Sequence, residues 1–156
     1  MSPELEDLYQ QVLLEHSKHP RNFGTIAEGA VQVHGDNPSC GDEIDLHVRF
    51  GPEREVAEIK FTGQGCAICL ASASMMTTKL KGRSRAQAVE LADAFHALVT
   101  GTGTAPASGL GDLQLLEGVR KFPQRVKCAM LAWRAFQQAL LTPAAEAATV
   151  STESGS

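Results

Sequence analysis

Residues 43–50 read Glu43-Ile44-Asp45-Leu46-His47-Val48-Arg49-Phe50. Polar and apolar side chains alternate strictly along this stretch, which predicts a β-strand with one buried and one solvated face. Residues 31–33 indicate an earlier strand, and residues 57–61 alternate in the same way after a turn that contains Gly51 and Pro52. Three short strands in succession predict an antiparallel sheet whose apolar face is covered by helices.

The rest of the chain has the pattern of helices, because apolar residues recur at intervals of three and four before Pro20 and after Gly65. The expected helices cover residues 3–19, 66–81, 84–99, 113–119 and 123–140. We therefore predict an α+β fold, in which a three-stranded antiparallel sheet carries about five helices packed mainly on one face. Residues 1–141 are expected to form a single domain, and residues 142–156, which are mostly small and polar, a disordered tail.

The composition is that of an ordinary globular protein. The 156 residues are 43% hydrophobic and 21% charged, and the net charge is −4. This charge argues against a nucleic-acid-binding surface. No apolar run approaches the roughly 18 residues that a membrane span needs, and the acidic N-terminus lacks the apolar core of an export signal. We therefore expect a cytoplasmic protein, in whose reducing surroundings cysteines bind metals or react more often than they form disulfides.

Cys40 lies in the turn-forming segment at residues 37–42, which joins two of the predicted strands and reads Asn-Pro-Ser-Cys-Gly-Asp. A thiol in such a loop is accessible, which makes Cys40 a candidate nucleophile. Asp42 follows closely enough for its carboxylate to share a cation with that thiol. The alternative, a turn with a bystander thiol, is disfavoured because cysteine is an unusual choice for an exposed turn.

Two further cysteines come from distant parts of the chain. Cys66 opens a helix, where free N–H groups and the helix dipole favour a thiolate. Cys128 lies one turn inside the last helix and near basic side chains. Because each thiol is close to a strand end or a helix start, all three could meet at one end of the fold. With Asp42 they would supply the four ligands of a tetrahedral zinc ion: Cys40, Asp42, Cys66 and Cys128.

Cys66 and Cys69 together form a C-x-x-C sequence, which leaves three interpretations open. The pair could be a dithiol redox site, it could hold zinc with both sulfurs, or Cys69 could pack in the core as a small hydrophobe. The last interpretation is favoured because the chain around residue 66 does not have the pattern of a βαβ unit. Among the histidines, His34 is an outside candidate for a metal ligand, and His47 is expected to be solvated on the polar face of its strand.

The same segments resemble the iron–sulfur cluster assembly family that contains IscU-type scaffolds and SufU-type sulfur acceptors. The chain is more similar to the SufU type, because Lys127 stands where IscU-type proteins carry a histidine, and residues 84–111 match a longer SufU-type segment. Cys69 departs from the family, whose members usually carry a non-thiol there. The matching pieces are Pro20-Arg21-Asn22-Phe23-Gly24, Asn37-Pro38-Ser39-Cys40-Gly41-Asp42, Gly63-Gln64-Gly65-Cys66-Ala67-Ile68, Ala71-Ser72-Ala73-Ser74 and Arg125-Val126-Lys127-Cys128-Ala129.

This resemblance implies a SufE/IscU-like fold and a zinc ion bound by Cys40, Asp42, Cys66 and Cys128, with Cys40 as the sulfur acceptor. The implied partners are a SufS-like cysteine desulfurase, which forms a persulfide with its own pyridoxal phosphate, and a downstream iron–sulfur scaffold. Because four protein ligands leave zinc no open position, we expect Cys40 to leave the ion before it attacks the persulfide. Two alternatives are an IscU-like scaffold that assembles a [2Fe–2S] cluster on the same residues, and a non-catalytic zinc module that binds a partner.

Overall fold

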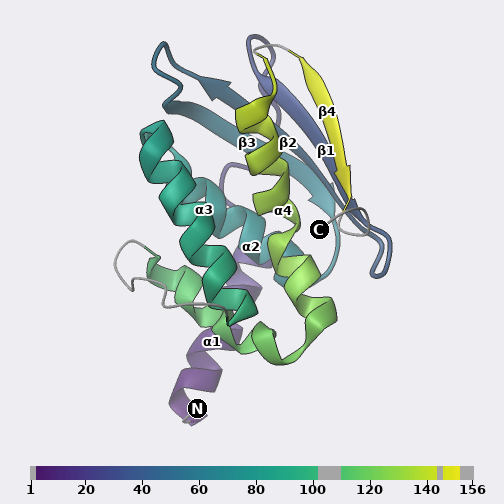
Figure 1. Cartoon of the computed structure of the whole chain (residues 1–156). Coiled ribbons are helices and arrows are strands. Elements are labelled where there is room, and N and C mark those ends of the chain that lie inside the picture. Colours follow the sequence, from purple (N-terminus) through teal and green to yellow (C-terminus); the bar gives the residue numbers. More distant parts are fainter. Residues whose placement is uncertain (1–2, 102–109, 144–145, 152–156) are drawn as a thin grey trace.

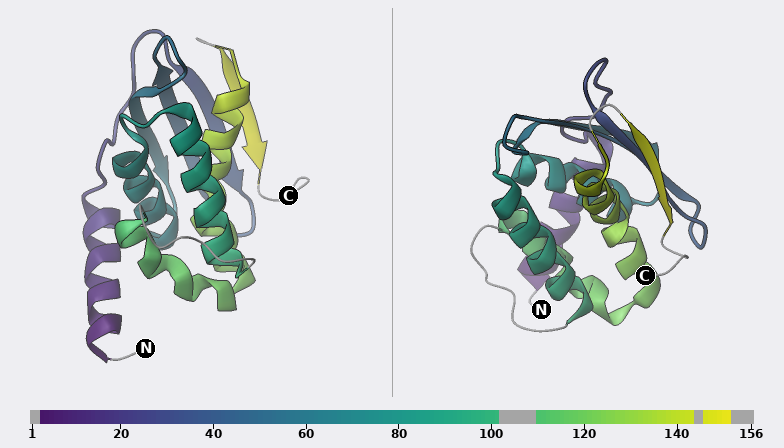
Figure 2. Two further views of the ribbon diagram at one scale, coloured as in Figure 1. Left: turned by 60° about the vertical axis from the view of Figure 1, so that its left-hand side comes forward. Right: turned by 45° about the horizontal axis from the view of Figure 1, so that its top comes forward.

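The computed structural model describes residues 3–101, 110–143 and 146–151. It contains one sheet with helices packed against one face, while the other face is open (Figures 1 and 2). The α+β class, the three antiparallel strands and the five helices are thereby confirmed for the described residues. The elements in chain order are α1 (Pro3–Lys18), β1 (Val31–Asn37), β2 (Asp42–Phe50), β3 (Val56–Gln64), α2 (Ala67–Leu80), α3 (Arg85–Thr100), the 3-10 helix η1 (Gly111–Lys121), α4 (Pro123–Leu141) and β4 (Ala147–Ser151).

The sheet has the strand order β3-β2-β1-β4, and β2 pairs antiparallel with both β1 and β3. On the inner face of β2, Ile44, Leu46 and Val48 are completely buried, as the alternation predicts, and Phe50 at the end of the strand is half-buried. In the register of the sheet, Asn37 pairs with Asp42, and Glu43 pairs with Gln64. The end of β1, the start of β2 and the end of β3 therefore meet at one end of the sheet, next to the start of α2.

The expectation of a disordered tail is wrong for β4, which pairs parallel with the edge of β1. The side chain of Val150 packs against the core beside Gly35, where an added Cβ would lie 3.3 Å from Cγ2 of Val150. The local sequence, Ala-Ala-Thr-Val-Ser, has too few apolar residues to show a strand pattern. β4 depends instead on the free edge of β1, a tertiary contact that the tail's own sequence does not reveal.

Helices α2 and α4 pack against the sheet and against each other (Figure 1). The buried hydroxyl of Ser72 on α2 donates to the carbonyl of Ala129 on α4 at 2.6 Å, and it accepts from Nε1 of Trp133 at 3.2 Å. The indole of Trp133 stacks on Phe95 of α3, with ring centroids 4.7 Å apart. These contacts fix α2 relative to α4, and thereby fix Cys66 at the start of α2 relative to Cys128.

Part of the predicted SufU-type segment at residues 84–111 is described by the structure. Helix α3 begins with the capping box at Ser84 and Gln87, and it forms the first part of the segment that resembles the SufU type. Residues 102–109 of that segment lie outside the described residues. Across the described ranges, no helix combines the length and the apolar character that a membrane crossing requires.

Candidate metal centre

Cys40 is presented by a tight turn between β1 and β2. The carbonyl of Asn37 accepts hydrogen bonds from the backbone N–H groups of Cys40 at 3.2 Å and Gly41 at 2.9 Å. Gly41 has φ +73°, a left-handed conformation that glycine adopts at little cost. The turn leaves Cys40 exposed, whereas Asp42, the next residue but one, is completely buried. The predicted accessible loop thiol is therefore present.

The buried Asp42 carboxylate is held by two hydrogen bonds, one to each oxygen. Its Oδ1 accepts from the backbone N–H of Cys66 at 2.9 Å, and its Oδ2 accepts from Nδ2 of Asn37 at 3.1 Å. Gly65 makes room for this group, because a Cβ there would lie 2.5 Å from Oδ1. A buried carboxylate needs such partners to offset its desolvation, and each oxygen keeps a lone pair that can bind a cation.

Three of the predicted ligands are gathered around this carboxylate. One ligand atom each from Cys40, Asp42 and Cys128 lie within 4.8 Å of one another, a grouping that could hold a metal ion. The Sγ atoms of Cys128 and Cys40 are 3.6 Å apart, and Nδ2 of Asn37 lies 3.5 Å from Sγ of Cys128. Residues far apart in the sequence therefore converge as predicted.

The donor set fits a metal cation. Burial raises the pKa of the Cys128 thiol, and its hydrogen bond with Asp42 raises the pKa further. The thiol therefore keeps its proton unless a cation replaces it. Sulfur and carboxylate ligands of this kind suit zinc, and cysteine thiolates also bind iron–sulfur clusters.

Cys66 is the N-cap residue of α2 and is half-buried. Its N–H holds Asp42, and its Sγ accepts from the N–H of Cys69 at 3.4 Å. The group within 4.8 Å does not include its sulfur. That sulfur is nevertheless close enough to contribute to the raised pKa of Cys128. The role of Cys66 as fourth ligand therefore stays a prediction.

A cation from the protein itself flanks the cluster. The pKa of the Arg125 guanidinium is raised, chiefly by the charge of Cys66 and also by a hydrogen bond with Cys128. Arg125 can therefore stabilise negative charge on the thiols. Arg125 lies three residues, about one helical turn, before Cys128 on α4, so the two side chains are on the same side of the helix.

The remaining candidates lie apart from the cluster. Cys69 is completely buried, which confirms that it packs in the core, and burial raises the pKa of its thiol. His34 is hydrogen-bonded to Asp45 and does not belong to the metal-binding group. The expectation that His47 is solvated is wrong, because the residue is only 8% exposed.

Residues 8–129 match the family described as "NifU-like N terminal domain". The chain belongs to this iron–sulfur cluster assembly family. Curated relatives of this NifU-like chain carry two different names. It is 44% identical over 137 residues to the iron-sulfur cluster assembly scaffold protein IscU of Streptococcus pyogenes serotype M1, covering 88% of this chain and 85% of the relative. It is 41% identical over 134 residues to the zinc-dependent sulfurtransferase SufU of Bacillus subtilis, covering 86% of this chain and 90% of the relative.

Solved structures agree with the NifU-like fold. A protein from Fervidobacterium islandicum AW-1, described as a candidate iron–sulfur cluster assembly scaffold for the SUF system, superposes with a TM-score of 0.79. The two chains are 30% identical, and the match covers 86% of this chain and 98% of that one. The crystal structure of a hypothetical protein with 43% identity gives the same TM-score, and the match covers 88% of this chain and 99% of that one.

Asn37 is the residue of this NifU-like site that sequence analysis missed. In the sequence Asn37 is only the first residue of the turn-forming segment, yet its amide donates to Asp42 and reaches Sγ of Cys128. A usable indication exists in the sequence. Asn37 has the same parity as Val31 and Val33, so it is on the buried face of β1, where a polar side chain needs a partner.

Proposed function

We propose that this protein is a zinc-dependent sulfurtransferase that accepts persulfide sulfur from a SufS-like, pyridoxal-phosphate-dependent cysteine desulfurase and passes it to a downstream iron–sulfur scaffold. One observation carries the proposal: an exposed Cys40 thiol lies 3.6 Å from the buried thiol of Cys128 and beside the buried Asp42. The reactive thiol of Cys40, on an exposed turn, thus lies next to buried side chains that can bind a metal ion. The sulfurtransferase name of the Bacillus subtilis relative supports this activity.

Zinc would be held by Cys40, Asp42, Cys66 and Cys128. The ion would supply the positive charge that keeps buried thiols deprotonated, and it would favour the folded chain. Asp42 keeps its position through the N–H of Cys66, and Cys128 keeps its position through the packing of α4 on α2. Cys40 alone among the four is exposed, so it is the thiol that can move toward a partner.

The transfer step balances without an oxidant. The Cys40 thiolate attacks the outer sulfur of the desulfurase persulfide, so an S–S bond forms on Cys40 and the S–S bond of the donor breaks. The cysteine of the desulfurase leaves as a thiolate. The left-handed Gly41 lets the turn change conformation, and Arg125 stabilises the negative charge near the sulfurs.

The test combines metal analysis with a transfer assay. Freshly purified protein should be colourless with one zinc per chain, and it should raise the turnover of a SufS-type desulfurase and gain one sulfur on Cys40, seen by mass spectrometry. Cys40→Ser should abolish sulfur gain, whereas the matched control Cys69→Ala should retain it. Chelation should lower the melting temperature, because the ion binds the folded chain. Sulfur gain in Cys40→Ser would contradict the assignment.

The scaffold function is the second candidate, and the 44% identity to the Streptococcus pyogenes scaffold protein supports it. In that case a [2Fe–2S] cluster would be the cargo assembled on the same residues. Brown protein with iron, and no rise in desulfurase turnover, would favour this function. Bound zinc without any effect on turnover would instead favour a module that binds a partner and has no catalytic role.

A further inference from the structure

The thiols of Cys40 and Cys128 are close enough to react with each other as well as to share an ion. Their Sγ atoms are 3.6 Å apart. They touch at the boundary between solvent and core, because Cys40 is exposed and Cys128 is completely buried. A disulfide sets its two sulfurs about 2.0 Å apart, so the pair would have to close by roughly 1.6 Å.

The turn that carries Cys40 is the part that can make this movement. The next residue, Gly41, has φ +73°, and a Cβ there would meet nothing within 4 Å, so the turn projects into open space. Cys128 is fixed instead by the packing of α4 on α2, in which the Ser72 hydroxyl donates to the backbone of α4 at 2.6 Å. Nδ2 of Asn37 lies 3.5 Å from Sγ of Cys128 and also holds that sulfur. Cys40 can therefore approach a stationary Cys128.

A persulfide on Cys40 would face Cys128 in an arrangement that suits displacement. The outer sulfur comes from a partner and so arrives from solvent, whereas Cys128 contacts Cys40 from the core. The outer sulfur and Cys128 therefore lie on different sides of Sγ of Cys40, as the expulsion of one sulfur by another requires. The 3.6 Å contact is also close to the roughly 3–3.5 Å of a near-attack arrangement.

We infer, on the basis of the sulfur transfer proposed above, that Cys128 discharges the Cys40 persulfide when zinc is lost. The Cys128 thiolate attacks Sγ of Cys40, the bond from that sulfur to the outer sulfur breaks, and a Cys40–Cys128 disulfide forms. The persulfide reacts in its protonated form, so the outer sulfur leaves as hydrosulfide. The step needs no further oxidant, because the outer sulfur gains the two electrons that the two cysteines lose. A bound zinc ion would engage Cys128 and prevent the attack.

The charges of the cluster favour this discharge once the cation has gone. A thiolate left at Cys128 shares a dry site with the buried carboxylate of Asp42, and buried charges without a counter-charge are costly. The attack converts this thiolate into a neutral disulfide, and the negative charge moves into solvent with the hydrosulfide. Arg125, which flanks the thiols and is hydrogen-bonded with Cys128, attracts the departing anion.

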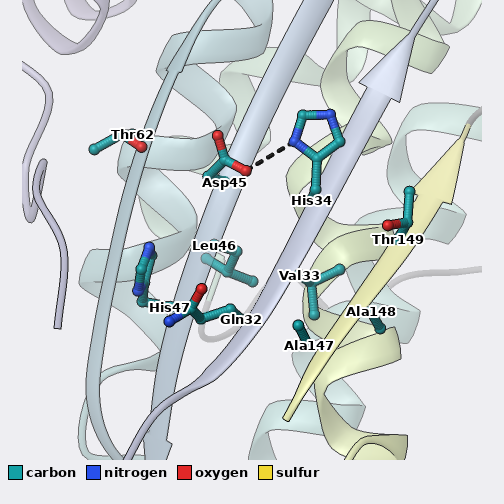
Figure 3. Close-up of a pocket in the computed structure, with 10 residues that line it drawn as sticks. All are labelled: Gln32, Val33, His34, Asp45, Leu46, His47, Thr62, Ala147, Ala148 and Thr149. Carbon is teal, nitrogen blue, oxygen red and sulfur yellow. Dashed lines mark hydrogen bonds and ion pairs between the residues drawn. The ribbon is translucent and has the colours of Figure 1, made fainter. Parts of the chain in front are cut away.

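The reaction is confined to the side of the sheet that faces the helices. On the open face, a pocket of about 430 Å³ lies between β4, β1 and β2, and among the described residues that line it there is no cysteine (Figure 3). There Nδ1 of His34 and Oδ1 of Asp45 are 2.8 Å apart. Asp42 has the opposite parity to Asp45 on β2 and is buried. His34→Ala therefore changes this end of the sheet without touching the thiols.

The test starts from zinc-loaded protein that has taken up sulfur from a SufS-type desulfurase and has been separated from it in the absence of oxygen. One half receives excess EDTA and the other half receives none. The chelated half should release one sulfide for each persulfide, at a rate that does not depend on protein concentration, because the reaction occurs within one chain. Peptide mapping should find a disulfide between Cys40 and Cys128. The unchelated half should keep its sulfur at least about tenfold longer, because Cys128 stays on the ion.

Three variants sharpen the result. Cys69→Ser is the matched control, since Cys69 is as completely buried as Cys128, and it should discharge like the unchanged protein. His34→Ala, at a half-exposed position, should also discharge normally. Cys128→Asp keeps an oxygen ligand for zinc but has no thiol, so its persulfide should survive chelation at least about tenfold longer. Its melting temperature and zinc content are checked first, and the disulfide mapped in the unchanged protein decides the question without this variant.

The outcomes separate the discharge from the sulfur transfer on which it depends. A persulfide that survives chelation in the unchanged protein would overturn the inference, and so would a disulfide from Cys40 to Cys66, to Cys69 or to a second chain. Each of these results leaves the proposed sulfur transfer intact. Zinc-loaded protein that never gains sulfur on Cys40 would overturn the sulfur transfer, and the discharge with it.

Discussion

The backbone N–H of Cys66 donates a 2.9 Å hydrogen bond to Oδ1 of Asp42, so the start of α2 holds the carboxylate at the start of β2. This contact joins the two segments that the sequence pattern assigns to one metal site. It also gives Cys66 a structural task that is independent of its sulfur. Any change that moves the Asp42 carboxylate should therefore alter the whole site.

Gly65→Ala should displace that carboxylate. A Cβ at this position would lie 2.5 Å from Oδ1 and 3.1 Å from Cβ of Asp42, so the carboxylate must move. We expect zinc affinity, measured by competition with a chelator, to fall by about 10- to 100-fold, the range found when the support of a metal ligand is lost. Gly118→Ala is the matched control, because a Cβ there meets nothing within 4 Å. Equal affinities in the two variants would contradict the role of Gly65.

Asn37→Ala should destabilise the fold even without metal. It removes the donor to Oδ2 of Asp42 and the contact with Sγ of Cys128, and an unsatisfied buried acceptor costs about 1–3 kcal/mol. Urea denaturation of the zinc-free protein measures this loss. Gln64→Ala is the control, because it removes an exposed hydrogen bond from the Gln64 amide to the carboxylate of Glu43. Surface substitutions of this kind change the free energy of unfolding by no more than about 0.5 kcal/mol. A loss no larger than the control's would show that Asn37 does not support Asp42.

The sequence predicts those parts of the fold that depend on local pattern. The alternation around Leu46 defines β2, and Ser84 with Gln87 defines the start of α3, because neighbouring residues carry the whole pattern. The turn at Cys40 and its juxtaposition with Asp42 follow from strand order and from the residue types of the turn. These features are present in the structure as predicted.

Other features depend on contacts between distant segments. β4 forms because it pairs with the free edge of β1, and its own five residues, Ala-Ala-Thr-Val-Ser, do not show a strand pattern. His47 is on the solvent face by parity, yet the surrounding sheet buries it. The amide of Asn37 meets Cys128 across 91 positions of the chain. Periodicity assigns a face to each of these residues, but it does not say what covers that face.

The four cysteines should differ in their rates of alkylation in the metal-free, folded protein. Cys40 is exposed and should react first, while Cys69 and Cys128 are buried with raised pKa values. They should react at least about tenfold more slowly, because a rise of one in pKa lowers the thiolate fraction about tenfold. Mass spectrometry of iodoacetamide-treated peptides gives the order. Zinc should protect Cys40, and early labelling of Cys69 would contradict its placement in the core.

Ser72→Ala should loosen the contact between α2 and α4. The buried hydroxyl links the carbonyl of Ala129 to Nε1 of Trp133, and its removal leaves both without this partner, at a cost of about 1–3 kcal/mol. Thermal unfolding measures the loss. Ser17→Ala is the control, because that hydroxyl lies on the outer helix α1 and donates to Leu14. Similar losses in both variants would rule out a special role for the Ser72 bridge.

Val150→Asp should release β4 while the other three strands remain. Val150 is half-buried against the core beside Gly35, so a carboxylate there would have to be desolvated or would leave with the strand. Thr149→Asp is the control, because Thr149 is exposed and a carboxylate at this position carries the same charge without being buried. Hydrogen exchange reports the result residue by residue: the β4 amides should exchange faster in Val150→Asp, whereas the amides between β2 and β3 should stay protected. Because β4 pairs at the edge of the sheet, we expect a loss of about 1–2 kcal/mol and an intact thiol cluster. Fast exchange of β4 in the unchanged protein would contradict the fourth strand, and loss of protection throughout the sheet would show that β4 supports the whole fold.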